Sequence, residues 1–126
     1  MQSLIGSSAH FIFDSETGFF ARWGKTKEDD PLFAPRPEIL DMEITTACKG
    51  PGGKVCPFCY KANTPAGTFM PFETFKKIID KMPWLTQVAF GVDAQCESNP
   101  DVWKIMEYTR KIGIIPNVTV ADCRSE

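Results

Sequence analysis

The sequence predicts an α/β protein whose parallel strands alternate with helices, preceded by an N-terminal β-hairpin. From residue 39 onward, short apolar runs alternate with helical periodicity in the order strand, loop, helix, strand, helix, strand. This order is typical of parallel strands joined by right-handed crossovers. Before residue 37, two aromatic-rich runs flank a short turn segment. We therefore divide the chain into a hairpin with its linker, residues 1–37, and a βα domain, residues 38–126.

Length and composition fit one globular domain. The chain has 126 residues, of which 43% are hydrophobic and 24% charged, with a formal net charge of -2. No basic stripe of the kind that binds a phosphate backbone is present in the sequence, so nucleic acid is not indicated as a partner. The first residues lack a signal-peptide pattern, and no stretch approaches the roughly 20 apolar residues of a membrane span. We expect a cytoplasmic protein that does not contact the membrane.

The hairpin is predicted over residues 10–14 and 19–23. The four residues between these aromatic-rich runs end in Gly18, which we expect at positive φ. His10 is the only histidine and opens the first run, so its expected role is that of a partly buried structural residue. Residues 24–37 contain three prolines and many charges without periodicity, which is typical of a surface linker.

Three strands and two helices are predicted in the second domain. The strands are expected at residues 39–45, 86–91 and 114–121. The first helix, residues 71–82, should bury one face, made of Phe72, Phe75, Ile79 and Met82. The second helix should begin with Asn99 as its cap and end at Gly113. Its predicted apolar stripe consists of Val102, Ile105, Met106, Thr109 and Ile112.

The cysteines indicate a metal or cluster site. They are odd in number, and Cys56 and Cys59 stand at a ligand spacing, which in a reducing compartment favours metal binding over a disulfide framework. Cys48 follows the first predicted strand by three residues, at the end where parallel α/β folds collect catalytic groups. Three glycines between Cys48 and Cys56 allow the backbone to wrap around a compact inorganic core.

Three thiolates suit a [4Fe–4S] cluster with one iron left open, whereas four would close the cluster for electron transfer. The first strand, the three cysteines, the aromatic Phe58 before the last cysteine, and the following helix resemble the radical S-adenosylmethionine (SAM) superfamily. The resemblance covers residues 38–122. The first cysteine gap is seven residues here and usually three in that family. The segment Gly91-Val92-Asp93 stands where the family has Gly-Gly-Glu.

The resemblance implies a partial (βα) barrel with about three βα units. It implies that the [4Fe–4S] cluster binds SAM and, once reduced, cleaves it to methionine and a 5'-deoxyadenosyl radical. By the same resemblance, Phe58 contacts the adenine and Gly91, Val92 and Asp93 lie beside the methionine amine. The implied partners are an unidentified substrate, a reductant protein for the cluster, and a second chain or missing C-terminal half that completes the barrel. The implied cluster ligands are Cys48, Cys56 and Cys59.

Other interpretations stay open at this point. The chain could be a non-enzymatic Fe–S carrier, a structural remnant with a helper role, or a zinc module whose fourth ligand is His10, Cys96 or Cys123. We expect Cys96 to be a small buried residue and assign no role to Cys123. The acids Asp93, Glu97 and Asp101 could be read as a metal carboxylate set. We prefer to read them as loop acids and helix N-terminal charges.

Overall fold

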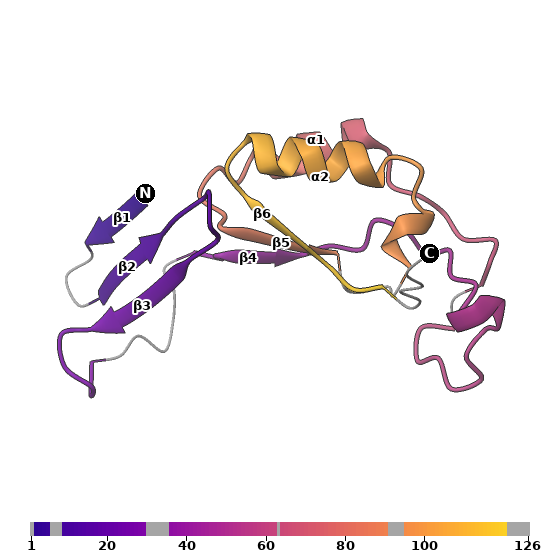
Figure 1. Ribbon diagram of the computed structural model, residues 1–126, viewed down its shortest axis with the longest axis horizontal. Coiled ribbons are helices and arrows are strands. Elements are labelled where there is room, and N and C mark those ends of the chain that lie inside the picture. The colour runs from indigo at the N-terminus through magenta and orange to yellow at the C-terminus, as the bar shows by residue number, and fades with distance from the viewer. Residues whose placement is uncertain (1, 6–8, 30–35, 63, 91–94, 121–126) are drawn as a thin grey trace.

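The computed structural model describes residues 2–5, 9–29, 36–62, 64–90 and 95–120. It shows an α/β fold with an N-terminal antiparallel sheet and an open sheet of three parallel strands accompanied by two helices. In Figure 1 the antiparallel sheet lies at one end, the parallel sheet and helices lie in the middle, and the magenta segment around residue 50 lies at the other end. The predicted α/β class and the preceding hairpin are confirmed.

The N-terminal sheet is built around the predicted hairpin. Its strands pair antiparallel in the order β1 (Gln2–Ile5), β2 (Ala9–Phe13) and β3 (Phe20–Gly24). Between β2 and β3, Gly18 has the expected positive φ of 77°. The Asp14 carboxylate accepts hydrogen bonds from the Glu16 amide at 3.0 Å and the Thr17 hydroxyl at 2.7 Å. These bonds lower the pKa of Asp14 and hold the turn. Strand β1 has no alternating pattern, so the sequence does not predict it.

The parallel sheet carries the core on one face. Its order is β4 (Ile39–Asp41), β5 (Gln87–Phe90) and β6 (Ile115–Val118). Helices α1 (Phe72–Ile79) and α2 (Val102–Lys111) lie together on the same side of this sheet (Figure 1). The core between the helices and the sheet consists of Met42, Ile44, Phe75, Ile79, Leu85, Val88, Phe90, Cys96, Val102, Ile105 and Ile114.

The predicted helix faces point into this core. Phe75 and Ile79 of α1 and Ile105 of α2 are fully buried. Ile112, the last residue of the predicted stripe on α2, is instead 38% exposed. The reason is that the helix has already ended, and Gly113 turns the chain toward β6 with φ of 83°. The stop signal in the sequence was therefore correct, while the stripe was extended one residue too far.

The first parallel strand is shorter than the predicted 39–45. It ends at Asp41, because the chain then changes its pairing partner. The Met70 amide donates a hydrogen bond to the Ile44 carbonyl at 2.9 Å, and Thr45 forms an antiparallel bridge with Phe69. The backbone after β4 therefore pairs with the segment that precedes α1.

Asn99 has a different role from the predicted helix cap. Asp101 occupies the N-cap position of α2, and Asn99 is buried two residues earlier, with 1% of its surface exposed. The side-chain nitrogen of Asn99 donates hydrogen bonds to the backbone carbonyls of Ile44 at 2.6 Å and Met70 at 2.9 Å. Its side-chain oxygen accepts one from the Asp101 amide at 2.8 Å. A single side chain thus ties together the starts of both helices and the backbone after β4.

We expect Asn99→Ala to destabilise the fold by about 2–4 kcal/mol, because it removes the side-chain donor to the Met70 carbonyl and one of two donors to the Ile44 carbonyl, and opens a cavity. The measurement is urea unfolding followed by circular dichroism. Asn117→Ala is the matched control, since Asn117 is exposed and donates one side-chain hydrogen bond, to Gln87 at 2.9 Å. It should cost less than about 1 kcal/mol. Equal stability losses in the two variants would contradict the role given to Asn99.

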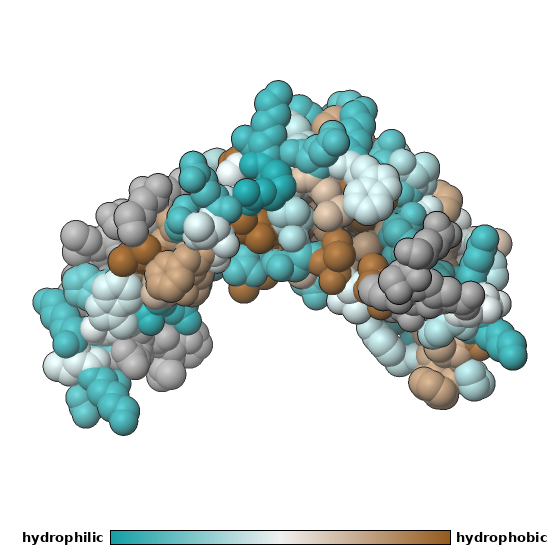
Figure 2. Space-filling model, in the orientation of Figure 1, coloured by the Kyte–Doolittle hydropathy of each residue, from teal (hydrophilic) through white to brown (hydrophobic). Residues whose placement is uncertain are grey.

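Polar contacts join the N-terminal sheet to the later part of the chain. The Arg22 guanidinium lies 3.2 Å from the Glu38 carboxylate, and Arg110 donates a hydrogen bond to the Ser15 carbonyl at 2.9 Å. Figure 2 shows the outline of an arch, hollowed beneath the parallel sheet on the side away from the helices. The division of the chain after residue 37 stays a prediction. Within the described ranges, no helix has the length and apolarity needed to cross a membrane.

Candidate metal centre

The two ends of the cysteine loop, residues 48–62, lie side by side. Ala47 forms a parallel bridge with Thr64, and the Cys48 amide donates a hydrogen bond to the Thr64 carbonyl at 3.0 Å. Gly67 approaches the same backbone so closely that a Cβ there would lie 2.1 Å from the Ala47 nitrogen. The loop therefore has a closed base beyond the carboxyl end of β4.

Glycine shapes the first half of the loop, as the sequence predicts. The 3-10 turn η1 (Pro51–Gly53) follows Gly50, which has φ of 75°. A Cβ on Gly50 would lie 1.8 Å from the carbonyl oxygen of Lys54, so only glycine fits there without a backbone shift. This turn folds the loop back on itself between the first and second cysteines.

The three predicted ligands share this loop. Cys48, Cys56 and Cys59 are all partly exposed. The last two lie on one turn, in which the Cys59 amide donates a hydrogen bond to the Cys56 carbonyl at 3.2 Å. Across the part of the chain that the structure describes, no three His, Cys, Asp or Glu side chains gather closely enough to hold a metal ion. The donor set thus fits a cluster in its chemistry and accessibility, while its three thiols are not drawn together.

The predicted SAM-contacting residues fall into two groups. Phe58 lies on the turn between Cys56 and Cys59 and is 86% exposed, so its ring is open to a ligand. The segment Gly91-Val92-Asp93 lies outside the described residues, and so does Cys123. Their predicted roles stay predictions.

Two of the three alternatives for a fourth zinc ligand, His10 and Cys96, pack within the fold. His10 stacks on Trp23 in the N-terminal sheet, with ring centroids 5.5 Å apart. That sheet lies at the opposite end of the molecule from the cysteine loop (Figure 1). Cys96 is buried, with 3% of its surface exposed, and burial together with the charge of Glu97 raises the pKa of its thiol. A raised pKa disfavours the thiolate that binds metals. The partial burial expected for His10 and the burial expected for Cys96 are confirmed.

Asp101, one of the three acidic residues considered as a metal carboxylate set, lies at the starts of the two helices. The Phe72 amide, at the start of α1, donates a hydrogen bond to the Asp101 carboxylate at 2.9 Å. Asp101 itself stands at the N-cap of α2, so its charge lies near the start of both helices. This position agrees with the reading of Asp101 as a helix N-terminal charge. Asp93 lies outside the described residues.

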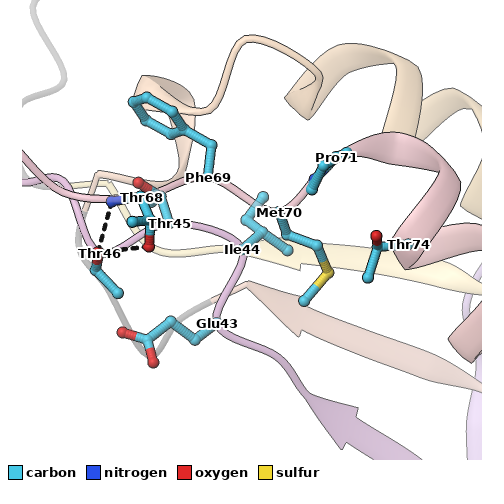
Figure 3. A pocket seen from close by; sticks show the side chains of 9 residues that line it. All are labelled: Glu43, Ile44, Thr45, Thr46, Thr68, Phe69, Met70, Pro71 and Thr74. Carbon is cyan, nitrogen blue, oxygen red and sulfur yellow. Dashed lines mark hydrogen bonds between the residues drawn. The ribbon is translucent and has the colours of Figure 1, made fainter.

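An open pocket lies beside the base of the cysteine loop (Figure 3). The hydroxyls of Thr46 and Thr68 share a hydrogen bond of 3.2 Å inside it. Glu43, at its rim, forms an ion pair with Lys61 of the cysteine loop. Neither interaction has a sequence signal, because the partners come from separate segments. The pocket has a volume of about 280 Å³ and is lined by Glu43, Ile44, Thr45, Thr46, Thr68, Phe69, Met70, Pro71 and Thr74.

Sequence reasoning missed the residues that fasten the loop to the rest of the fold. Gln95 and Ser98 lie on or next to the 3-10 turn η2 (Cys96–Ser98) and contact the backbone around Cys48. Their partners lie 46 and 51 residues earlier in the chain, respectively. No periodicity or spacing rule relates positions so far apart, so only the folded chain reveals these contacts.

The chain matches no protein-family model, no curated protein and no solved structure.

Proposed function

We propose that this chain is the front part of a radical SAM-type enzyme, with Cys48, Cys56 and Cys59 as ligands of a [4Fe–4S] cluster. One observation carries the proposal: three accessible cysteines share a glycine-shaped loop beyond the carboxyl end of the first parallel strand. Parallel α/β folds place cofactors at this end of the sheet. Three protein thiolates leave one iron of such a cluster open to an exogenous ligand.

The bound cluster would supply an electron that cleaves SAM to methionine and a 5'-deoxyadenosyl radical. The chain's own residues hold and orient the reactants. The exposed ring of Phe58 offers a face on which the adenine can stack. Gly91-Val92-Asp93 follows β5 and, as proposed from the resemblance, contacts the methionine amine. A reductant protein delivers the electron, and a reducing compartment such as the cytoplasm keeps the thiols available.

The test is anaerobic reconstitution of the full chain with iron and sulfide. We expect a brown protein that absorbs in the violet, bleaches with dithionite, and changes its electron paramagnetic resonance spectrum when SAM is added. A colourless protein that binds one zinc per chain would support the zinc module instead. A bleachable cluster with a spectrum unaffected by SAM would support the non-enzymatic Fe–S carrier.

The variant Phe58→Ala tests whether the Phe58 ring contributes to SAM binding. We expect it to keep its iron and to weaken SAM binding about tenfold or more, since stacking of a base on an aromatic ring contributes about 1–3 kcal/mol. Trp103→Ala is the matched control, because Trp103 is 68% exposed and lies on α2. SAM affinity unchanged in Phe58→Ala would remove this residue from the cofactor site.

A further inference from the structure

Residues 95–98, which follow β5 in the chain, hold the first residues of the cysteine loop through hydrogen bonds. The Lys49 amide donates a hydrogen bond to the Gln95 side-chain oxygen at 2.6 Å. The Gln95 side-chain nitrogen donates one to the Gly50 carbonyl at 3.3 Å. One side chain therefore satisfies a donor and an acceptor on consecutive loop residues, because an amide carries its acceptor and its donor on separate atoms.

A second contact lies on the other side of Cys48. The Ser98 hydroxyl donates a hydrogen bond to the Ala47 carbonyl at 3.0 Å and shares another, of 3.1 Å, with the Thr45 hydroxyl. The backbone is thus held before Cys48 by Ser98 and after it by Gln95. Both holding residues belong to one short segment, residues 95–98, which packs on the core through the buried Cys96.

The other two cysteines lie on a different part of the loop. Two backbone hydrogen bonds close short turns there, one from the Cys59 amide to the Cys56 carbonyl and one from the Ala62 amide to the Cys59 carbonyl. The backbone around Cys48 is therefore held by residues distant in the chain, and short turns help to arrange the Cys56–Cys59 pair.

We propose that Gln95 is a positioning residue that fixes the backbone at Cys48 and so presets the first metal ligand. The ligand-positioning half of this inference rests on the proposed function. The loop-anchoring half does not, because it concerns the chain without metal. Residues that orient metal ligands through hydrogen bonds typically change metal affinity about 10–100-fold when they are lost.

The loop-anchoring half is tested by limited trypsin digestion of the metal-free full chain. The peptide bond after Lys49 lies at the anchor, and the bond after Lys54 lies beyond it on the same loop. We expect Gln95→Met, which keeps the side-chain length and removes both hydrogen bonds, to speed cleavage after Lys49 about fivefold to tenfold relative to cleavage after Lys54. Gln95→Glu, which keeps only the acceptor, should fall between Gln95→Met and the wild type.

Gln87→Met is the matched control, since it makes the same chemical change on β5, where Gln87 accepts a hydrogen bond from Asn117. It should leave the ratio of the two cleavages unchanged. Cleavage after Lys49 at the wild-type rate in Gln95→Met would overturn the anchor. An equal rise after Lys49 and Lys54 would overturn it too, because it would show a general loosening.

The ligand-positioning half is tested on the reconstituted protein by the rate at which a ferrous chelator removes iron. We expect Gln95→Met to lose iron at least about tenfold faster than the wild type and Gln87→Met to match the wild type. Equal rates in wild type and Gln95→Met would overturn the positioning role. If the wild-type chain takes up no iron, the proposed function is wrong, and the proposal that Gln95 positions a metal ligand is wrong with it. The trypsin digestion would still decide whether Gln95 anchors the loop.

Discussion

Replacing Cys48, Cys56 or Cys59 by alanine is expected to remove most of the iron bound after anaerobic reconstitution. A cluster held by only three protein ligands needs all three of them. Loss of even a residue that hydrogen-bonds to a metal ligand reduces metal affinity about 10–100-fold, so loss of a ligand itself should have a larger effect. The measurement is iron per chain together with the violet absorbance. Each variant should fold as well as the metal-free wild type, because the three side chains are partly exposed and contribute little to the core.

Two other cysteines are the controls for this experiment. Cys96→Ala should keep its iron, because Cys96 packs in the core and burial raises the pKa of its thiol. Cys123→Ala should keep it as well, since neither the spacing pattern nor the resemblance includes this residue. Full iron retention in Cys48→Ala would remove Cys48 from the site and leave the Cys56–Cys59 pair, which favours a different metal site.

The isolated chain is expected to cleave SAM slowly or not at all. The open parallel sheet has three strands in the order β4, β5, β6, so within the described residues β4 and β6 each have a single neighbour in that sheet. The helices cover one face of the sheet, and the other face borders the hollow of the arch (Figures 1 and 2). Parallel sheets are normally covered on both faces, and exposed strand edges pair readily with other chains. We therefore propose that a second chain, or a further part of the same protein, completes the barrel.

The experiment compares the mass of the reconstituted chain in solution with its production of 5'-deoxyadenosine under reducing conditions. We expect self-association or loss of iron, with product formed at far below ordinary enzymatic rates, which are about 1–1000 per second. Addition of the completing partner should restore cleavage, and Cys59→Ala should remain inactive with that partner present. A monomer that cleaves SAM at an ordinary rate would show that three parallel strands with their two helices suffice.

The composition of the candidate site could be predicted from local pattern, whereas its supports could not. The CxxC spacing, the glycines before it and the preceding strand all lie within a short stretch of sequence, so they could be recognised without the fold. Gln95 and Ser98 carry no comparable signal. They contact backbone groups 46 and 51 residues away, respectively, and such contacts exist only after the chain has folded.

The sequence by itself determined the order of strands and helices from β2 onward, the helix faces apart from Ile112, the Gly18 and Gly113 turns and the placement of three cysteines on one loop. Each depends on side-chain periodicity or backbone preference over a few neighbouring residues. Only the tertiary structure decided where β4 stops, because Ile44 leaves that strand to pair with Met70. It likewise made Asn99 a buried bridge in place of a cap, since a buried amide must satisfy whichever backbone groups the packed helices bring to it.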